Sequence, residues 1–99
     1  MSQIELSKQD LEKVKHNADL YLEVYLGNML YPATPVKVII NGEEMYKVPI
    51  KSHYDNGLHT LGHIYLDAKS LGVNKALSST REDIDKVVED ITKNESSLL

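Results

Sequence analysis

The segment from Val36 to Val48 constrains the fold more than any other part of the chain, because it has the pattern of a β-hairpin. A mostly apolar run ends at Asn41-Gly42, and these two residues supply the positive φ angles that a type I′ turn requires. We therefore predict an antiparallel two-stranded hairpin over about 36–50. Two registers stay open, because a two-residue loop pairs Ile40 with Glu43 and a four-residue loop pairs Ile40 with Met45.

Pro49 limits where this hairpin can lie in a sheet. Proline has no N–H to give to a ladder, so we expect the second strand to lie at a sheet edge or to end there. A lone hairpin is barely stable in water and must pack on helices or pair with a strand of another chain. An uncovered hairpin edge would suit dimerisation, or β-augmentation by a strand of another protein.

Apolar residues at helical spacing predict a long first helix over about 7–30, with Ser7 as its N-cap. Pro32 must stop this helix, and Gly27-Asn28 could end it one turn earlier. The apolar stripe comprises Leu11, Val14, Ala18, Tyr21, Tyr25 and Met29.

The second half of this helix is apolar nearly all round, since only Glu23 carries a charge between Leu20 and Leu30. Such a helix must be covered on several sides. Either the rest of the domain covers it or a second subunit does. The residues expected to mediate self-association in the second case are Tyr21, Leu22, Tyr25, Leu26 and Met29.

Two further helices are expected after the hairpin. The first spans about 57–71, between caps at Asp55 or Asn56 and at Gly72. The second spans about 80–93, starts with a capping box of Ser79 and Glu82, and leaves a frayed tail over 94–99. The fold class is therefore α+β, a single small domain over 1–99 in the order α-β-β-α-α, with a long N-terminal helix, an antiparallel hairpin and two C-terminal helices.

Composition excludes several classes of protein. With 11 basic and 15 acidic residues the formal charge is −4, which argues against non-specific nucleic-acid binding. No apolar run approaches the length of a membrane span, and the N-terminus lacks the pattern of a signal peptide, so we expect a cytoplasmic protein. The chain has no cysteine, which excludes disulfides, thiolate metal sites and cysteine catalysis.

All the aromatic residues are tyrosines. They are Tyr21, Tyr25, Tyr31, Tyr46, Tyr54 and Tyr65. A buried tyrosine still needs a partner for its hydroxyl, so this set suits half-wet surfaces such as binding faces and subunit contacts. The alternative explanation is a thin core, in which most aromatic side chains of a small domain reach the edge.

Three of the four histidines lie close together in the sequence, and they raise the question of a metal site. On a helix, His59 and His63 would lie one turn apart, a spacing at which two imidazoles can chelate a divalent metal, and Asp67 continues the series. That pair would lie opposite the apolar stripe, so a solvent-exposed pair that titrates near neutral pH is the competing interpretation. No cofactor is expected. No catalytic motif occurs either, so we expect no enzyme.

Lysines and aromatic residues gather in the middle of the chain. Lys37, Lys47 and Lys51 lie near Tyr46, His53 and Tyr54. Such a group could hold a small anionic ligand by charge and ring stacking, or its lysines could guard a strand edge against aggregation.

These patterns favour a small non-enzymatic binding protein that acts on another protein through a surface, as a homo-oligomer. Small inhibitors and phage- or immunity-like accessory factors act in this way, an analogy of size alone. The partner or ligand surface is expected at Tyr46, Lys47, Lys51, His53, Tyr54, His59 and His63. One alternative is a module that sequesters a nucleotide-like anion, and a second is a divalent-metal protein that uses His59 and His63.

Overall fold

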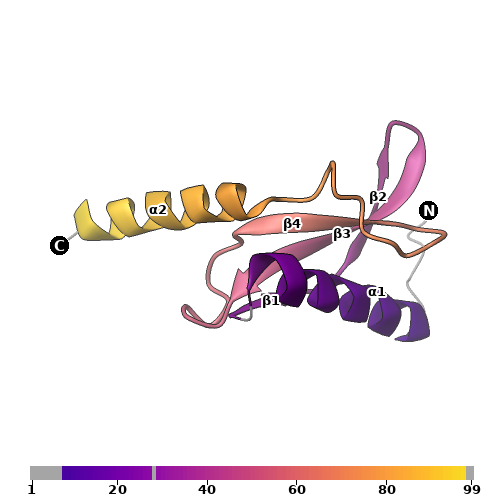
Figure 1. Cartoon of the computed structure of the whole chain (residues 1–99), viewed down its shortest axis with the longest axis horizontal. Coiled ribbons are helices and arrows are strands. Elements are labelled where there is room, and N and C mark those ends of the chain that lie inside the picture. Colours follow the sequence, from indigo (N-terminus) through magenta and orange to yellow (C-terminus); the bar gives the residue numbers. More distant parts are fainter. Residues whose placement is uncertain (1–7, 28, 98–99) are drawn as a thin grey trace.

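The hairpin is present, and its second strand is the centre of an antiparallel sheet (Figure 1). The computed structural model describes residues 8–27 and 29–97. Strands β2 (Val36–Ile40) and β3 (Glu43–Ser52) meet at Asn41 and Gly42, whose φ angles are 51° and 80°. Ile40 pairs with Glu43, so the chain uses the two-residue loop, because both turn residues tolerate the left-handed conformation.

The expectation that Pro49 lies at an edge, or ends its strand, is wrong. β1 (Leu30–Pro32) and β2 both pair with one edge of β3, and β4 (Gly62–Asp67) pairs with the other edge. The Pro49 carbonyl accepts a hydrogen bond from the Ala33 N–H at 2.9 Å, in the break between β1 and β2. The N–H and C=O of one antiparallel residue point to the same side, so the missing N–H faces this break and β3 continues to Ser52.

The predicted helix over 57–71 is also wrong, because residues 62–67 form strand β4 and the residues before them form a loop. Ile64 and Leu66 face the core, whereas His63 and Tyr65 alternate with them. The apolar pattern of this segment therefore fits the two-residue repeat of a strand as well as the repeat of a helix. Pairing with β3 selects the strand. The chain has four strands and two α-helices in its described part, not the order α-β-β-α-α.

Gly72 consequently ends no helix. Its carbonyl accepts a hydrogen bond from the Asp67 N–H at 2.9 Å, in the turn that follows β4.

The first helix ends earlier than 30, at the glycine that the sequence offered as the alternative. Helix α1 (Lys8–Tyr21) runs into a π-helical turn, η1 (Leu22–Leu26), and Gly27 ends it with a φ angle of 114°. The Gly27 N–H donates to the Leu22 carbonyl at 2.7 Å. Leu30 then begins β1. The proposed N-cap Ser7 lies outside the described residues.

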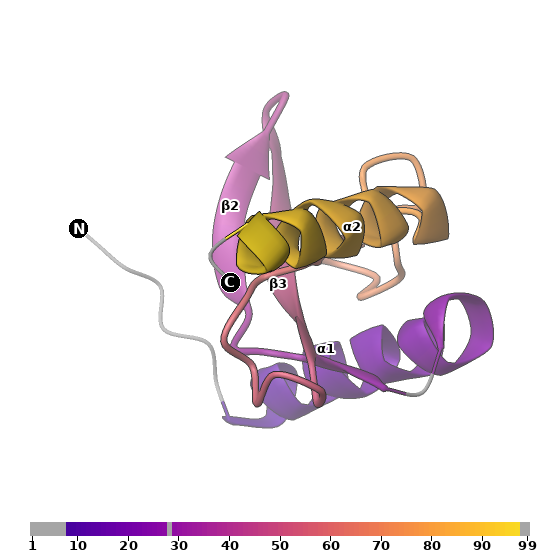
Figure 2. The same cartoon turned by 90° about the vertical axis from the view of Figure 1, so that its left-hand side faces the viewer.

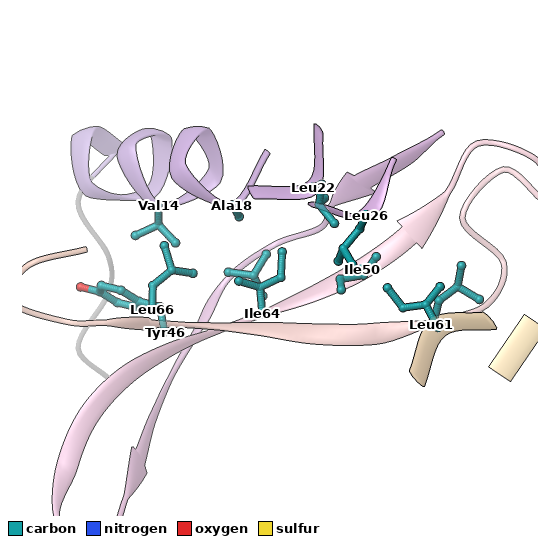
Figure 3. Packing of buried hydrophobic residues seen from close by; sticks show 11 residues of the cluster. Val14, Ala18, Leu22, Leu26, Tyr46, Ile50, Leu61, Ile64 and Leu66 are labelled. Carbon is teal, nitrogen blue, oxygen red and sulfur yellow. The ribbon is translucent and has the colours of Figure 1, made fainter. Parts of the chain in front are cut away.

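The core lies between α1 with η1 and one face of the sheet (Figure 3). The helical side supplies Val14, Ala18, Leu22 and Leu26, and the strands supply Tyr46, Val48, Ile50, Ile64 and Leu66. Figure 2 shows α1 along the bottom of the view and α2 (Arg81–Ser97) above it, in front of β3.

This packing corrects the proposed self-association surface. Leu22 is fully buried and Leu26 is buried, so neither can contact a partner in the folded chain. Tyr21 is half-buried, while Tyr25 and Met29 remain exposed. The sheet of the same domain therefore covers one side of the apolar half-helix.

Helix α2 begins one residue later than the predicted capping box. The Asp83 N–H donates to Thr80 Oγ1 at 3.2 Å, and the Thr80 N–H donates to Asp83 Oδ2 at 2.9 Å, so Thr80 is the cap and not Ser79. Ile84 lies in the core, and the helix then extends beyond the end of β4 (Figure 1). Residues 94–97 are helical, which contradicts the predicted tail, and residues 98–99 lie outside the described part.

The segment from Val73 to Ser79 covers the free edge of β4. Ser78 Oγ accepts the Tyr65 N–H at 2.9 Å, and Ser79 Oγ accepts the His63 N–H at 3.0 Å. The carbonyls of the same two strand residues accept the N–H groups of Asn74 and Ser79. Loop hydrogen bonds thus satisfy this edge as a further strand would.

We expect Gly62→Ala to lower the free energy of unfolding by about 1–3 kcal/mol, as overpacking does. A Cβ there would lie 2.5 Å from Ser79 Oγ and 3.6 Å from Ile50 Cδ1. The matched control is Gly72→Ala, whose Cβ would meet only Ser70 Oγ, at 3.4 Å. Chemical denaturation of both variants measures the difference, and equal stabilities would contradict the close packing of β4 against this loop.

Leu22→Ala should cost about 2–5 kcal/mol of stability, because it empties a fully buried site. Its control is Val24→Ala, at a side chain that is 70% exposed, where we expect a change below about 0.5 kcal/mol. Unfolding curves and the mass in solution are measured together. If Leu22→Ala left the stability unchanged but altered the mass in solution, Leu22 would lie in a subunit interface and not in the core.

Candidate binding surface

The side of the sheet turned away from α1 carries basic and aromatic side chains. Alternation along β3 sends Val48 and Ile50 toward α1 and sends Lys47 and Lys51 to the other side. We call this second side the outer face and define it by Tyr31, Lys47, Lys51, His63 and Tyr65, all partly exposed.

The register places these side chains next to one another. Lys47 lies opposite Tyr65, with its Nζ 6.0 Å from the centre of the tyrosine ring. The rings of Tyr65 and His63 lie 6.5 Å apart, between centroids. Lys47, Tyr65 and His63 therefore form one continuous group across two strands.

Lys51 belongs to the other end of the outer face. Its Nζ donates to Thr60 Oγ1 at 2.7 Å. Tyr31 lies opposite Lys51 on β1 and stacks on His53 with 4.5 Å between ring centroids. A stacked aromatic pair thus lies beside the second lysine.

Two lysines bring positive charge to the outer face around His63. Burial lowers the pKa of His63 below the ordinary value of a histidine, and the charges of Lys47 and Lys51 lower it further. In the described part of the chain the ion pairs are Lys37–Glu44, Asp55–His59 and Glu89–Lys93, which leaves both of these lysines without a carboxylate partner. The outer face can therefore attract an anionic group.

The lowered pKa of His63 has a consequence for stability. At a pH just below 6.5 the unfolded chain binds a proton at this residue more readily than the folded chain does. As the pH drops from 6.5 through the lower pKa of His63 in the folded chain, protonation of this residue therefore reduces the free energy of unfolding.

The structure separates the predicted surface residues into those that gather and those that do not. Lys47, Lys51 and His63 gather on the outer face, with His53 at its end. Tyr46 does not belong there, because it pairs with Leu66 and is buried under α1. Tyr54 is 82% exposed and lies on the loop after β3.

His59 has a structural partner in that loop. Asp55 Oδ2 lies 2.9 Å from His59 Nδ1 and accepts the His59 N–H, while Asp55 Oδ1 accepts the Gly57 N–H. The hydrogen bond to the His59 side chain, helped by these N–H groups, holds the pKa of Asp55 below its ordinary value. These contacts order the turn between β3 and β4.

The proposed metal set rested on helical spacing, and that premise is wrong. His59 lies in the loop, His63 lies on β4, and Asp67 accepts the N–H groups of Lys69 and Ser70 at 2.8 and 2.9 Å. Among residues 8–27 and 29–97, no three histidine or carboxylate side chains group closely enough to hold a metal ion.

The partner surface predicted from the sequence leaves out Tyr31, Thr60 and Tyr65, although the tyrosines as a set suggest half-wet surfaces. In the predicted helix over 57–71 the helical spacing would place Tyr65 on the apolar stripe with Leu61 and Ile64, but that helix does not form. The signal that could have found it is the alternation from Gly62 to Asp67, which places Tyr65 beside His63 on one side of a strand.

Comparison of the chain with protein-family models, curated proteins and solved structures finds no match. Within the described residues, no helix is both long and apolar enough to cross a membrane. The geometry alone therefore defines the class, an α+β domain with an antiparallel sheet that is covered by α1 on one face.

Replacing either lysine of the outer face should raise the pKa of His63. We expect a rise in Lys47→Gln and in Lys51→Gln, because each variant removes a positive charge that disfavours the imidazolium. An NMR titration of the imidazole protons measures it. Lys13→Gln on the exposed side of α1 is the control, and a shift of equal size there would show that net charge and not the outer face sets this pKa.

Proposed function

We propose that this protein is a non-enzymatic binding protein whose outer face holds an acidic surface of another protein. The observation that supports this most is a pair of lysines, Lys47 and Lys51, on either side of His63, for which the described residues provide no carboxylate partner. Complementary charge of this kind directs association and selects the partner.

The spacing of the lysines favours a macromolecular partner. Lys47 and Lys51 are four residues apart on one strand, which is roughly 13 Å at about 3.3 Å per residue. An acidic segment of a protein can present several carboxylates over that length and contact both lysines where they stand, whereas a single phosphate would require both side chains to lean toward each other. Tyr31 and Tyr65 supply the aromatic area that interfaces favour.

The net charge of −4 favours a protein over a nucleic acid as this partner. A nucleic acid is a long polyanion that extends past the two lysines and would be repelled by the rest of the molecule. A short acidic segment of a protein can lie against the two lysines alone. A role as an inhibitor or accessory factor, in phage or immunity systems for example, belongs to this proposal by analogy of size.

One observation favours a second candidate function, the binding of a nucleotide-like anion. The stacked pair of Tyr31 and His53 lies beside Lys51, so a base could stack at this end while the lysine contacts a phosphate. Tyr46 can take no part in such a site, because it is buried on the other face.

The test uses a short oligoglutamate peptide and ATP as probes, followed by NMR on the full chain. We expect the peptide to shift the backbone signals of β3 and β4 on the outer face. The double variant Lys47→Gln/Lys51→Gln should bind the peptide about tenfold more weakly, as the loss of two exposed charge contacts implies.

The matched control is Lys13→Gln/Lys86→Gln, which removes the same two charges elsewhere and should bind as the native chain does. Equal weakening in both double variants would show an effect of net charge and contradict the proposal. Shifts confined to Tyr31, His53 and Lys51, seen with ATP and not with the peptide, would favour the second function.

A further inference from the structure

The two outer edges of the sheet differ. The edge of β4 is satisfied by the segment from Val73 to Ser79, whereas β2, as far as the chain is described, pairs with β3 alone. The hairpin projects beyond both helices (Figures 1 and 2). Two apolar side chains of β2 are exposed there, Val36 by 50% and Ile39 by 72%. An exposed strand edge with apolar side chains is a template for a further strand.

The register shows which backbone groups this edge offers. A two-residue turn makes Ile40 and Glu43 a hydrogen-bonded pair, and such pairs alternate along an antiparallel ladder. Val38 and Val36 therefore exchange hydrogen bonds with β3. Lys37 and Ile39 point their N–H and C=O groups to the outside.

We propose that a second copy of this chain pairs with the first through β2, antiparallel, about a two-fold axis at Val38. In this register Val38 lies opposite its own copy, Val36 lies opposite Ile40, and Lys37 exchanges hydrogen bonds with Ile39. It is the register in which all five residues of β2 overlap with the partner strand. A two-fold interface of this kind is self-complementary.

The side chains of β2 suit a second copy of the same strand. On the side of the outer face, every directly opposite pair joins two β-branched aliphatic residues, which stabilise cross-strand contacts. On the other side Lys37 lies opposite Ile39 and not opposite a second lysine.

Lysine on an edge strand ordinarily discourages pairing. Here the Nζ of Lys37 lies 3.0 Å from Glu44 Oε2 on the neighbouring strand. The charge that would repel an approaching copy is therefore paired with a carboxylate of the same hairpin.

Such a dimer would place both outer faces on the same side of one continuous sheet, because the two-fold axis stands perpendicular to it. Two sets of Lys47 and Lys51 would then face one partner. The dimer itself does not depend on the proposed function.

The experiment uses single cysteines, since the natural chain contains none. Val38→Cys should form a disulfide-linked dimer under mild oxidation, because the opposed Cα atoms of a non-hydrogen-bonded pair lie about 4.5 Å apart. Val36→Cys and Ile40→Cys should each cross-link poorly alone, since the copies of one residue are then roughly 13 Å apart along the strands. An equimolar mixture of these two variants should cross-link readily.

The mass in solution gives a second measurement that needs no cysteine. Ile39→Pro removes an outward N–H without removing a bond to β3, so light scattering across a dilution series should show a monomer. Ile39→Thr keeps the N–H and the β-branch, and it should remain a dimer. A monomeric native chain at every concentration, or Val38→Cys cross-linking no faster than Val36→Cys, would overturn the proposal.

Discussion

The structure depends on the pairing of β3 with other strands along both of its edges. β1 and β2 occupy one edge and β4 occupies the other, so the ten residues of β3 lie at the centre of the sheet. One face of that centre needs an apolar cover, and α1 with η1 supplies it through Val14, Ala18 and Leu22. Without β4, the helix would have too little apolar surface to pack against.

The same pairing creates the candidate binding surface. Because side chains alternate along a strand, burying Val48 and Ile50 under α1 forces Lys47 and Lys51 onto the opposite side. β4 adds His63 and Tyr65 next to them. The gathering of Lys47, Lys51 and His63 on the outer face is thus a consequence of the register, which brings residues of two distant segments together.

About half of this site follows from the sequence. Lys47, Lys51, His53 and His63 stand out as basic or aromatic residues in one stretch, and the structure gathers them. Tyr46 belongs to the same stretch and lies on the other face, since it differs from Lys47 by one position in a strand of period two. The tyrosines at 31 and 65 become recognisable only when the strands that carry them are paired with β3.

Features with a local cause could be predicted from the sequence. Asn41-Gly42 sets the hairpin turn and a run of helical spacing produces α2, because each depends on backbone preferences within a few residues. Gly27 is one of two ends that the sequence allows for the first helix, and the structure uses it. Tertiary structure alone decided that residues 62–67 form a strand and that Pro49 lies in a central one. Both outcomes depend on hydrogen bonds to distant segments. Residues 62–67 pair with β3, and the Pro49 carbonyl accepts the Ala33 N–H in the break between β1 and β2. Local periodicity fits a helix and a strand equally in so short a segment, and the partner strand decides between them.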